Sequence, residues 1–203
     1  MDSPKYLYRF FKKKKYRDDF LNGNIRFGRL ETYRTIEDEK RKDIDEGEAR
    51  AKYKTDKLIQ LSIDKVTGKT LSQGLTSGDM HISGTSLDHN FIACFSDERV
   101  NINQLARNMG KFAIKINDAG RLLDLLNISC KISWKAGRII LMQVVYNKDE
   151  YIEMGEDSHL PFEYFIAQKS QIFSAEHEWR AVLVGSALED VTDDHITINI
   201  GSI

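Results

Sequence analysis

The sequence predicts an α+β fold: a single globular domain over residues 1–203, with a mixed, mostly antiparallel sheet and short helices. Three observations predict it. Short aromatic and β-branched runs recur along the chain, and short amphipathic segments separate them. Only two prolines occur, and no internal repeat or flexible linker divides the chain. A chain of 203 residues is also long enough to bury one sizeable core.

The first thirty residues predict strand, helix, strand. Residues 5–11, KYLYRFF, are aromatic and extended by propensity. Residues 14–23, KKYRDDFLNG, carry apolar residues at helical spacing and end on Gly23, where a helix stops. In residues 24–30, NIRFGRL, apolar Ile25 and Phe27 alternate with polar residues, which predicts a second short strand.

The next segment, residues 31–57, is dominated by charge. It holds 17 charged residues in 27 and cannot form core. As a helix it would pair Glu37 with Arg41 on a solvated face. As a loop, it would fold over a cleft and bring Tyr33, Arg34 and Glu46 to its lining.

The rest of the chain predicts further strands around short helices. The predicted strands are a hairpin at residues 58–74 with its turn near residues 67–68, a buried strand at 90–96 (NFIACFS), and strands at 111–116, 137–147, 178–185 and 195–203. The predicted helices are 101–110, 118–127 and a segment from 160 to 170 that has proline in its first turn.

Composition gives no overall attraction to a polyanion or a membrane, because the net charge is −1. A polyanion or a membrane would need a local patch of positive charge on the protein. No run approaches the roughly 20 apolar residues of a membrane span, and the amino terminus lacks the order of a secretory signal. Cys94 and Cys130 lie among apolar residues at a spacing unlike a metal knuckle, which favours reduced thiols in a cytoplasmic protein.

Charged residues precede a predicted buried strand in FSAEHEWRAVLVG, residues 173–185. In a strand, Glu176, Glu178 and Arg180 would share one face, about 6.5–7 Å apart along the chain. Two carboxylates on one face can supply a base or an electrostatic partner. The alternative is a Glu–Arg ion pair that fixes a sheet end, and what Arg180 contacts decides between the two.

Two basic features lie near the amino terminus. Arg9 stands among aromatic residues, where its planar guanidinium suits a carboxylate, phosphate or amide oxygen unless it points to solvent. Tyr8 is expected on the face opposite to Arg9. Residues Lys12–Arg17 form a basic patch at a helix start, where it opposes the helix dipole and could attract phosphate; a solubilising loop is the alternative.

The sequence contains no Gly-rich phosphate loop, no GxSxG elbow and no zinc spacing. P-loop NTPases, dinucleotide-binding Rossmann folds and α/β-hydrolases are therefore excluded. A metal-dependent nuclease using Asp43, Glu46, Glu176 and Glu178 is one remaining hypothesis, although no histidine lies close to the first two.

The order LYRFF, FLNGNIRFGRL, FIACFS and FSAEHEWRAVL resembles a bacterial domain family of uncharacterised function, found near mobile elements and defence genes. Its members have a tyrosine-rich first strand and end with a lysine followed by E-x-E-W-R. The resemblance covers most of the chain, and EHEWR is its most specific part. It implies a place in a defence or mobile-element system, where the chain could act as a binding module or, as an ADP-ribosyltransferase-like enzyme, as a toxin or phage-defence effector.

A looser similarity links the chain to ADP-ribosyltransferases and implies their fold, with NAD as cofactor and a nucleic acid or protein as acceptor. On this similarity, Glu178 is the catalytic glutamate, Glu176 the first acid of the motif, and Arg9 the strand-one residue that holds NAD. Ser96 corresponds to the serine or tyrosine of that family's middle strand, while Tyr33, Arg34 and Glu46 line the cleft. The leading hypothesis is thus an NAD-dependent ADP-ribosyltransferase, and the alternative is a non-enzymatic binding module.

Overall fold

The structure is a computed structural model of the chain. It describes residues 4–33, 48–55, 58–63, 70–75, 78–85, 90–134, 137–147, 152–154, 166–184, 188 and 191–202. The described part has the predicted α+β character: three α-helices, two short 3-10 helices and twelve strands in three sheets.

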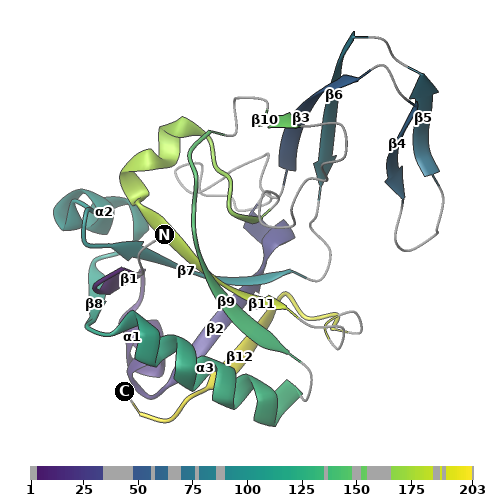
Figure 1. Cartoon of the computed structure of the whole chain (residues 1–203). Helices are drawn as coiled ribbons and strands as arrows, with labels where there is room; N and C mark the ends of the chain where they lie inside the picture. Colours follow the sequence, from purple (N-terminus) through teal and green to yellow (C-terminus); the bar gives the residue numbers. More distant parts are fainter. Residues whose placement is uncertain are drawn as a thin grey trace.

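A seven-stranded sheet forms the centre of the molecule, and all its pairings are antiparallel. Its strands are β1 (Leu7–Phe11), β2 (Asn24–Arg29), β7 (Phe91–Asp97), β8 (Phe112–Ile116), β9 (Arg138–Gln143), β11 (Glu178–Val184) and β12 (His195–Asn199). The helical segments are α1 (Lys14–Leu21), η1 (Leu30–Tyr33), α2 (Ile102–Met109), α3 (Ala119–Trp134) and η2 (Gln171–Glu176). Figure 1 shows α3 lying along one face of this sheet.

The sheet branches at β7. One edge of β7 pairs with β11 from Phe91 to Ser96. Its other edge is shared, because β2 pairs only with Phe91 and Ile92, whereas β1 pairs only with Ser96 and Asp97. Strands β1 and β2 therefore separate next to the middle of β7.

The two faces of the sheet bury different side chains. Alternate residues such as Phe95, Trp179 and Ala181 pack with α1 and α3 in the larger apolar core. The intervening residues face the other side, where Ile92 and Val182 pack with Leu30 and Ile166 in a smaller cluster. This second face also carries the charged residues of β11.

Two smaller sheets are formed by the segment between η1 and β7, together with one strand from later in the chain. Strand β3 (Glu48–Thr55) pairs antiparallel with β6 (Gly78–Thr85) and parallel with β10 (Ile152–Met154). Strands β4 (Leu58–Ile63) and β5 (Thr70–Leu75) pair antiparallel, which confirms the predicted hairpin.

The structure extends or corrects several predicted elements. Strand β3 lies within the charged segment, where no strand was predicted. Helix α3 continues to Trp134 instead of ending near residue 127. The hairpin turn and most of the predicted helix that begins near Pro161 lie outside the described residues.

Candidate functional site

Glu176 and Glu178 come together by a different route from the one predicted. Glu178 begins β11, but Glu176 is the last residue of η2, so the strand alternation does not reach it. His177 between them adopts a left-handed conformation, with φ of 43°. The prediction that three residues share one strand face is wrong for Glu176 and right for Glu178 and Arg180, which contact each other.

Arg180 pairs with Glu178 inside the protein. Its Nε donates to Glu178 Oε1 at 2.9 Å, and its Nη1 donates to the carbonyl oxygen of Ile166. Arg180 is only 1% exposed and Glu178 only 3%. This contact is the one that distinguishes a structural ion pair from a free carboxylate, and it favours the ion pair.

Lys169 joins the two glutamates. Its Nζ lies 2.7 Å from Glu176 Oε2 and 2.9 Å from Glu178 Oε2, and all three side chains are buried. The same ammonium lies 4.7 Å from the ring centre of Phe173. Lys169 was not predicted as a site residue, and the only signal for it was the lysine that precedes E-x-E-W-R in the resembling family. We call Lys169, Glu176, Glu178 and Arg180 the buried charge cluster.

The two carboxyl groups have opposite pKa shifts. Burial raises the pKa of Glu176 to about 7, although the Lys169 ammonium acts in the other direction. Burial would also raise the pKa of Glu178, but the charges of Arg180 and Lys169 outweigh it and hold that pKa well below its usual range. At neutral pH Glu178 is therefore an anion between two cations, whereas Glu176 holds its proton to a higher pH than an exposed glutamate does.

Half-buried polar groups of low acidity surround this cluster. The backbone N–H of Glu178 donates to the hydroxyl of Tyr146 at 2.7 Å, and the Cys94 thiol lies 3.8 Å from the hydroxyl of Tyr33. Burial raises the pKa of all three side chains, Tyr33, Cys94 and Tyr146. They are neutral at physiological pH, so none of them is a ready nucleophile.

Ser96 lies on the same face as Glu178. It is directly opposite Glu178 in β11 and directly opposite Tyr8 in β1, and it is buried. Residues opposite each other in an antiparallel sheet project to one side. The structure therefore brings together Tyr33, Ser96 and the two glutamates among the predicted site residues.

Arg9 lies on the other face. Its neighbour Tyr8 is level with Ser96, so Arg9 projects toward the larger core, as predicted for a residue opposite in direction to Tyr8. The guanidinium carbon lies 5.1–5.8 Å from the ring centres of Phe11, Phe20 and Phe95.

The Arg9 side chain bridges the branch in the sheet. Its Nη2 donates to the carbonyl oxygen of Arg26 in β2 at 2.9 Å, and burial lowers its pKa. Its Nη1 is buried without a hydrogen-bond partner in the part of the chain that is described. A cation held by three rings and a carbonyl between separated strands stabilises that branch point.

Other predicted residues cannot be placed. Arg34, Asp43 and Glu46 lie outside the described residues, so Tyr33 is the described member of the predicted cleft lining, and Glu176 and Glu178 are the described members of the four nuclease carboxylates. Within the described ranges, no three His, Cys, Asp or Glu residues form a group that could hold a metal ion.

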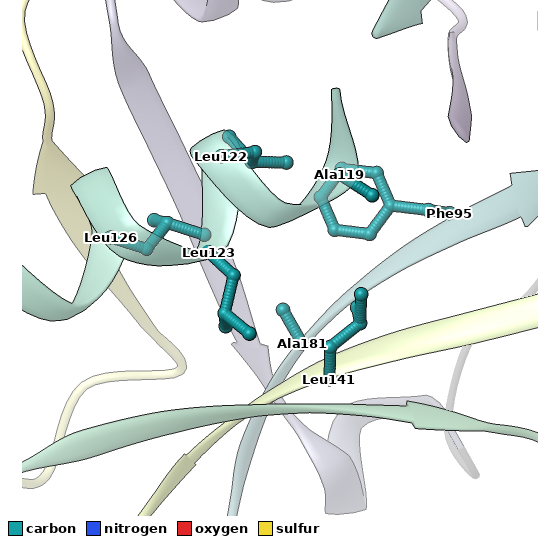
Figure 2. A pocket seen from close by; sticks show the side chains of 7 residues that line it. All are labelled: Phe95, Ala119, Leu122, Leu123, Leu126, Leu141 and Ala181. Carbon is teal, nitrogen blue, oxygen red and sulfur yellow. The ribbon is translucent and has the colours of Figure 1, made fainter. Parts of the chain in front are cut away.

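An apolar gap lies between α3 and the sheet, on the face away from Glu178 (Figure 2). Phe95 and Ala181 line it from the strands, and four leucines and Ala119 complete it. It has no room for a water molecule. It is a packing defect of the core and offers no polar group to a ligand.

The basic patch (Lys12–Arg17) lies on the surface at α1. Lys12, Lys13, Lys14 and Lys15 are all exposed, and neither a side-chain cap nor an acidic residue occupies the first turn of the helix. Of the described ion pairs, the patch takes part in two, Lys14 with Asp18 at 3.0 Å and Arg17 with the same carboxylate. Much of its positive charge therefore faces solvent.

Aromatic rings lie among these cations. Lys13 and Lys15 lie 5.9 and 5.0 Å from the ring centre of Tyr16. Phe112 at the start of β8 has Arg17 at 5.5 Å and Lys111 at 5.3 Å. Figure 1 shows α1, β1 and β8 in one region of the molecule, so the patch continues from the helix onto the edge of the sheet.

Comparison of the chain with protein-family models, with curated proteins and with solved structures gives no match. Among the helices that are described, none has the length and apolar character needed to cross a bilayer. Function is therefore inferred from the geometry of the buried charge cluster and of the basic patch.

Proposed function

We propose that this protein is a non-enzymatic binding module for nucleic acid, and that the basic patch (Lys12–Arg17) is its contact surface. The observation that carries the proposal is the run of four exposed lysines at the start of α1. Cations there oppose the helix dipole, so the run is unfavourable for the isolated helix. Phosphate groups would offset this repulsion and release their own counterions on binding.

The local charge supports an anionic partner although the whole chain is near neutral. Residues 4–21 contain seven Lys or Arg and two Asp, against a net charge of −1 for the protein. A local positive field of this kind attracts a polyanion without making the whole surface basic.

The buried charge cluster has a structural role in this proposal. Glu178 is neutralised by two cations and is shielded from solvent, so its interactions fix the start of β11 against residues 166–169. Removing one partner from such a pair leaves an uncompensated buried charge, which makes the cluster a strong constraint on the fold. A binding module of a defence or mobile-element system, as the sequence resemblance implies, needs no free carboxylate.

A charge-reversal experiment tests the proposal. We would measure the fluorescence anisotropy of a labelled oligonucleotide with wild type and with the double variant Lys13→Glu/Lys15→Glu. We expect affinity to fall by about 10-fold or more, and the slope of log K against log salt to fall by roughly 1.4–1.8 for two lost phosphate contacts.

The matched control is Lys131→Glu/Arg138→Glu, which reverses two exposed cations on α3 and β9. It should bind as wild type does. Equal loss in both double variants, or no binding by wild type at about 50 mM salt, would overturn the proposal.

A NAD-dependent ADP-ribosyltransferase is the second proposal. One observation favours it: Tyr33, Ser96 and Glu178 lie on one face of the sheet, with two carboxyl groups whose pKa values are shifted apart, a feature of acid–base pairs in enzymes. The arrangement leaves no free carboxylate for NAD, because Glu178 is bonded to Lys169 and Arg180.

Its test is incubation of the protein with labelled NAD and cell lysate. Label transfer by wild type that Glu178→Gln abolishes, with both proteins folded, would establish the enzyme and replace the binding-module proposal. Equal label and equal NAD loss in the two would end the enzyme proposal.

A further inference from the structure

A row of aromatic side chains follows β1 on the sheet face that also carries Ser96. Tyr8 and Phe10 alternate with Arg9 and are half-buried, and Tyr6 stands two residues before Tyr8. The rings of Tyr6 and Tyr8 lie 5.6 Å apart in an edge-to-face arrangement. We call Tyr6, Tyr8 and Phe10 the aromatic row.

The row lies next to the edge of the sheet. Strand β8 covers one side of β1, and among the described strands β8 pairs with no other. Lys115 of β8 is directly opposite Tyr8, and its ammonium lies 3.9 Å from the ring centre of Tyr6. Ala113, opposite Phe10, is exposed and too small to cover that ring. The row is therefore open to solvent along this edge.

Cations lie at both ends of the row. Lys5 precedes it and is exposed, and the lysines of the basic patch (Lys12–Arg17) begin one residue beyond Phe11, the last residue of β1. Over the seven residue-to-residue steps from Lys5 to Lys12, an extended chain spans roughly 23 Å. Aromatic faces with cations at their ends and flank match a ligand that carries planar groups and repeated negative charge.

The spacing of the rings distinguishes between the forms of nucleic acid. Successive side chains on one strand face are about 6.5–7 Å apart, about twice the roughly 3.4 Å between neighbouring bases of a duplex strand. Bases stacked on each other in a duplex cannot reach separate rings, whereas the unpaired bases of a single strand can turn onto them.

We propose that the aromatic row binds unpaired bases, so that the ligand of this surface is a single-stranded nucleic acid whose phosphates contact Lys115 and the basic patch. This inference rests on the proposed function and adds the ligand class and the residues that select it. Glu98 is the nearby acidic group that acts on Tyr8, and its charge works against the phosphates.

The test compares three labelled 12-mers on the full-length wild-type protein: a single strand, its duplex, and an abasic strand that has the same phosphates without bases. We expect the single strand to bind about 10-fold or more tightly than the other two, because base stacking contributes only there. Equal affinity for the single strand and the abasic strand would overturn the inference, and this arm needs no variant.

Variants of the row give the second arm. Tyr8→Leu should weaken single-strand binding by about 10-fold and leave the abasic strand within about 2-fold, and Tyr8→Phe should restore binding because the ring is retained. Glu98→Gln should strengthen binding of all three ligands. Equal loss for every ligand in Tyr8→Leu, or no rescue in Tyr8→Phe, would contradict base stacking.

The two proposals fail in different ways. If Lys13→Glu/Lys15→Glu binds all three 12-mers as wild type does, the proposed function is wrong. If that variant loses binding but wild type does not distinguish bases from abasic sugar, only the aromatic row inference is wrong. An acidic polypeptide, poly-glutamate, that competes as well as the single strand would indicate a protein partner and overturn both.

Discussion

Replacing Glu178 by glutamine removes one buried negative charge from between two cations. The amide keeps the volume of the side chain, so no cavity contributes to the loss. In the variant, Arg180 still donates to the Ile166 carbonyl, and Lys169 still contacts Glu176. Both cations lose the negative charge of Glu178, which Arg180 contacts at Oε1 and Lys169 at Oε2. We expect the free energy of unfolding to fall by about 3–5 kcal/mol, the range for breaking a buried ion pair.

Urea denaturation measures this loss. A domain typically has 5–15 kcal/mol of stability, and for a chain of this size the dependence on urea is roughly 2 kcal/mol per molar. The midpoint should therefore fall by about 1.5–2.5 M. The matched control is Glu98→Gln, an exposed carboxylate near the same sheet, which should change stability by no more than about 0.5 kcal/mol.

A double variant distinguishes the cost of removing the whole ion pair from the cost of leaving one of its charges unpaired. Glu178→Leu/Arg180→Met removes both ions together and leaves Lys169 with Glu176, so it should cost less than Glu178→Gln does alone. A Glu178→Gln protein that is folded and loses less than about 1 kcal/mol would refute the structural role of the cluster.

Three further outcomes follow from the geometry. Gly23→Ala should lower the melting temperature and cost more than about 1 kcal/mol, because Gly23 has φ of +84° and an added Cβ would overlap the Gly201 carbonyl oxygen; an unchanged melting curve would contradict this. Stability should fall as pH rises from about 5 to about 7, since the folded Glu176 carboxyl, with its pKa raised from 4.5 to about 7, holds its proton more tightly than the unfolded one. In Glu176→Gln, the urea midpoint should no longer fall over this pH range. If it still falls in the variant, a group other than Glu176 causes the pH dependence. Lys169→Met should destabilise the protein at neutral pH more than at pH 4, because the variant removes the cation that favours the ionised form of Glu176, and the cost of keeping that group protonated grows as pH rises; equal loss at both pH values would count against the contact between Lys169 and Glu176.

Local sequence pattern predicted the parts of the cluster that lie within one strand. Glu178 and Arg180 are two residues apart, and strand alternation alone places them on one face, where they pair. Glu176 could not be placed in this way, because the left-handed turn at His177 ends the alternation. Lys169 lies in an irregular segment, and only the fold brings it to both carboxylates.

The position of Arg9 shows a second limit of local pattern. Its aromatic neighbours were visible in the sequence, and so was its direction opposite to Tyr8. Its contact with Arg26 depends on β1 and β2 sharing one edge of β7, which is a matter of strand order and register. The charged segment likewise concealed β3, because charge excludes core but does not exclude a strand.

Photo-crosslinking tests the central claim most directly, because it reports where the ligand lies. A single strand that contains 4-thiouridine would be crosslinked to the wild-type protein, and the modified peptides would be mapped by mass spectrometry. The account predicts crosslinks within residues 4–17 and 111–116, on the basic patch, β1 and β8. Crosslinks concentrated on residues 166–184, around Lys169 and Glu178, would contradict it and move the function to the buried charge cluster.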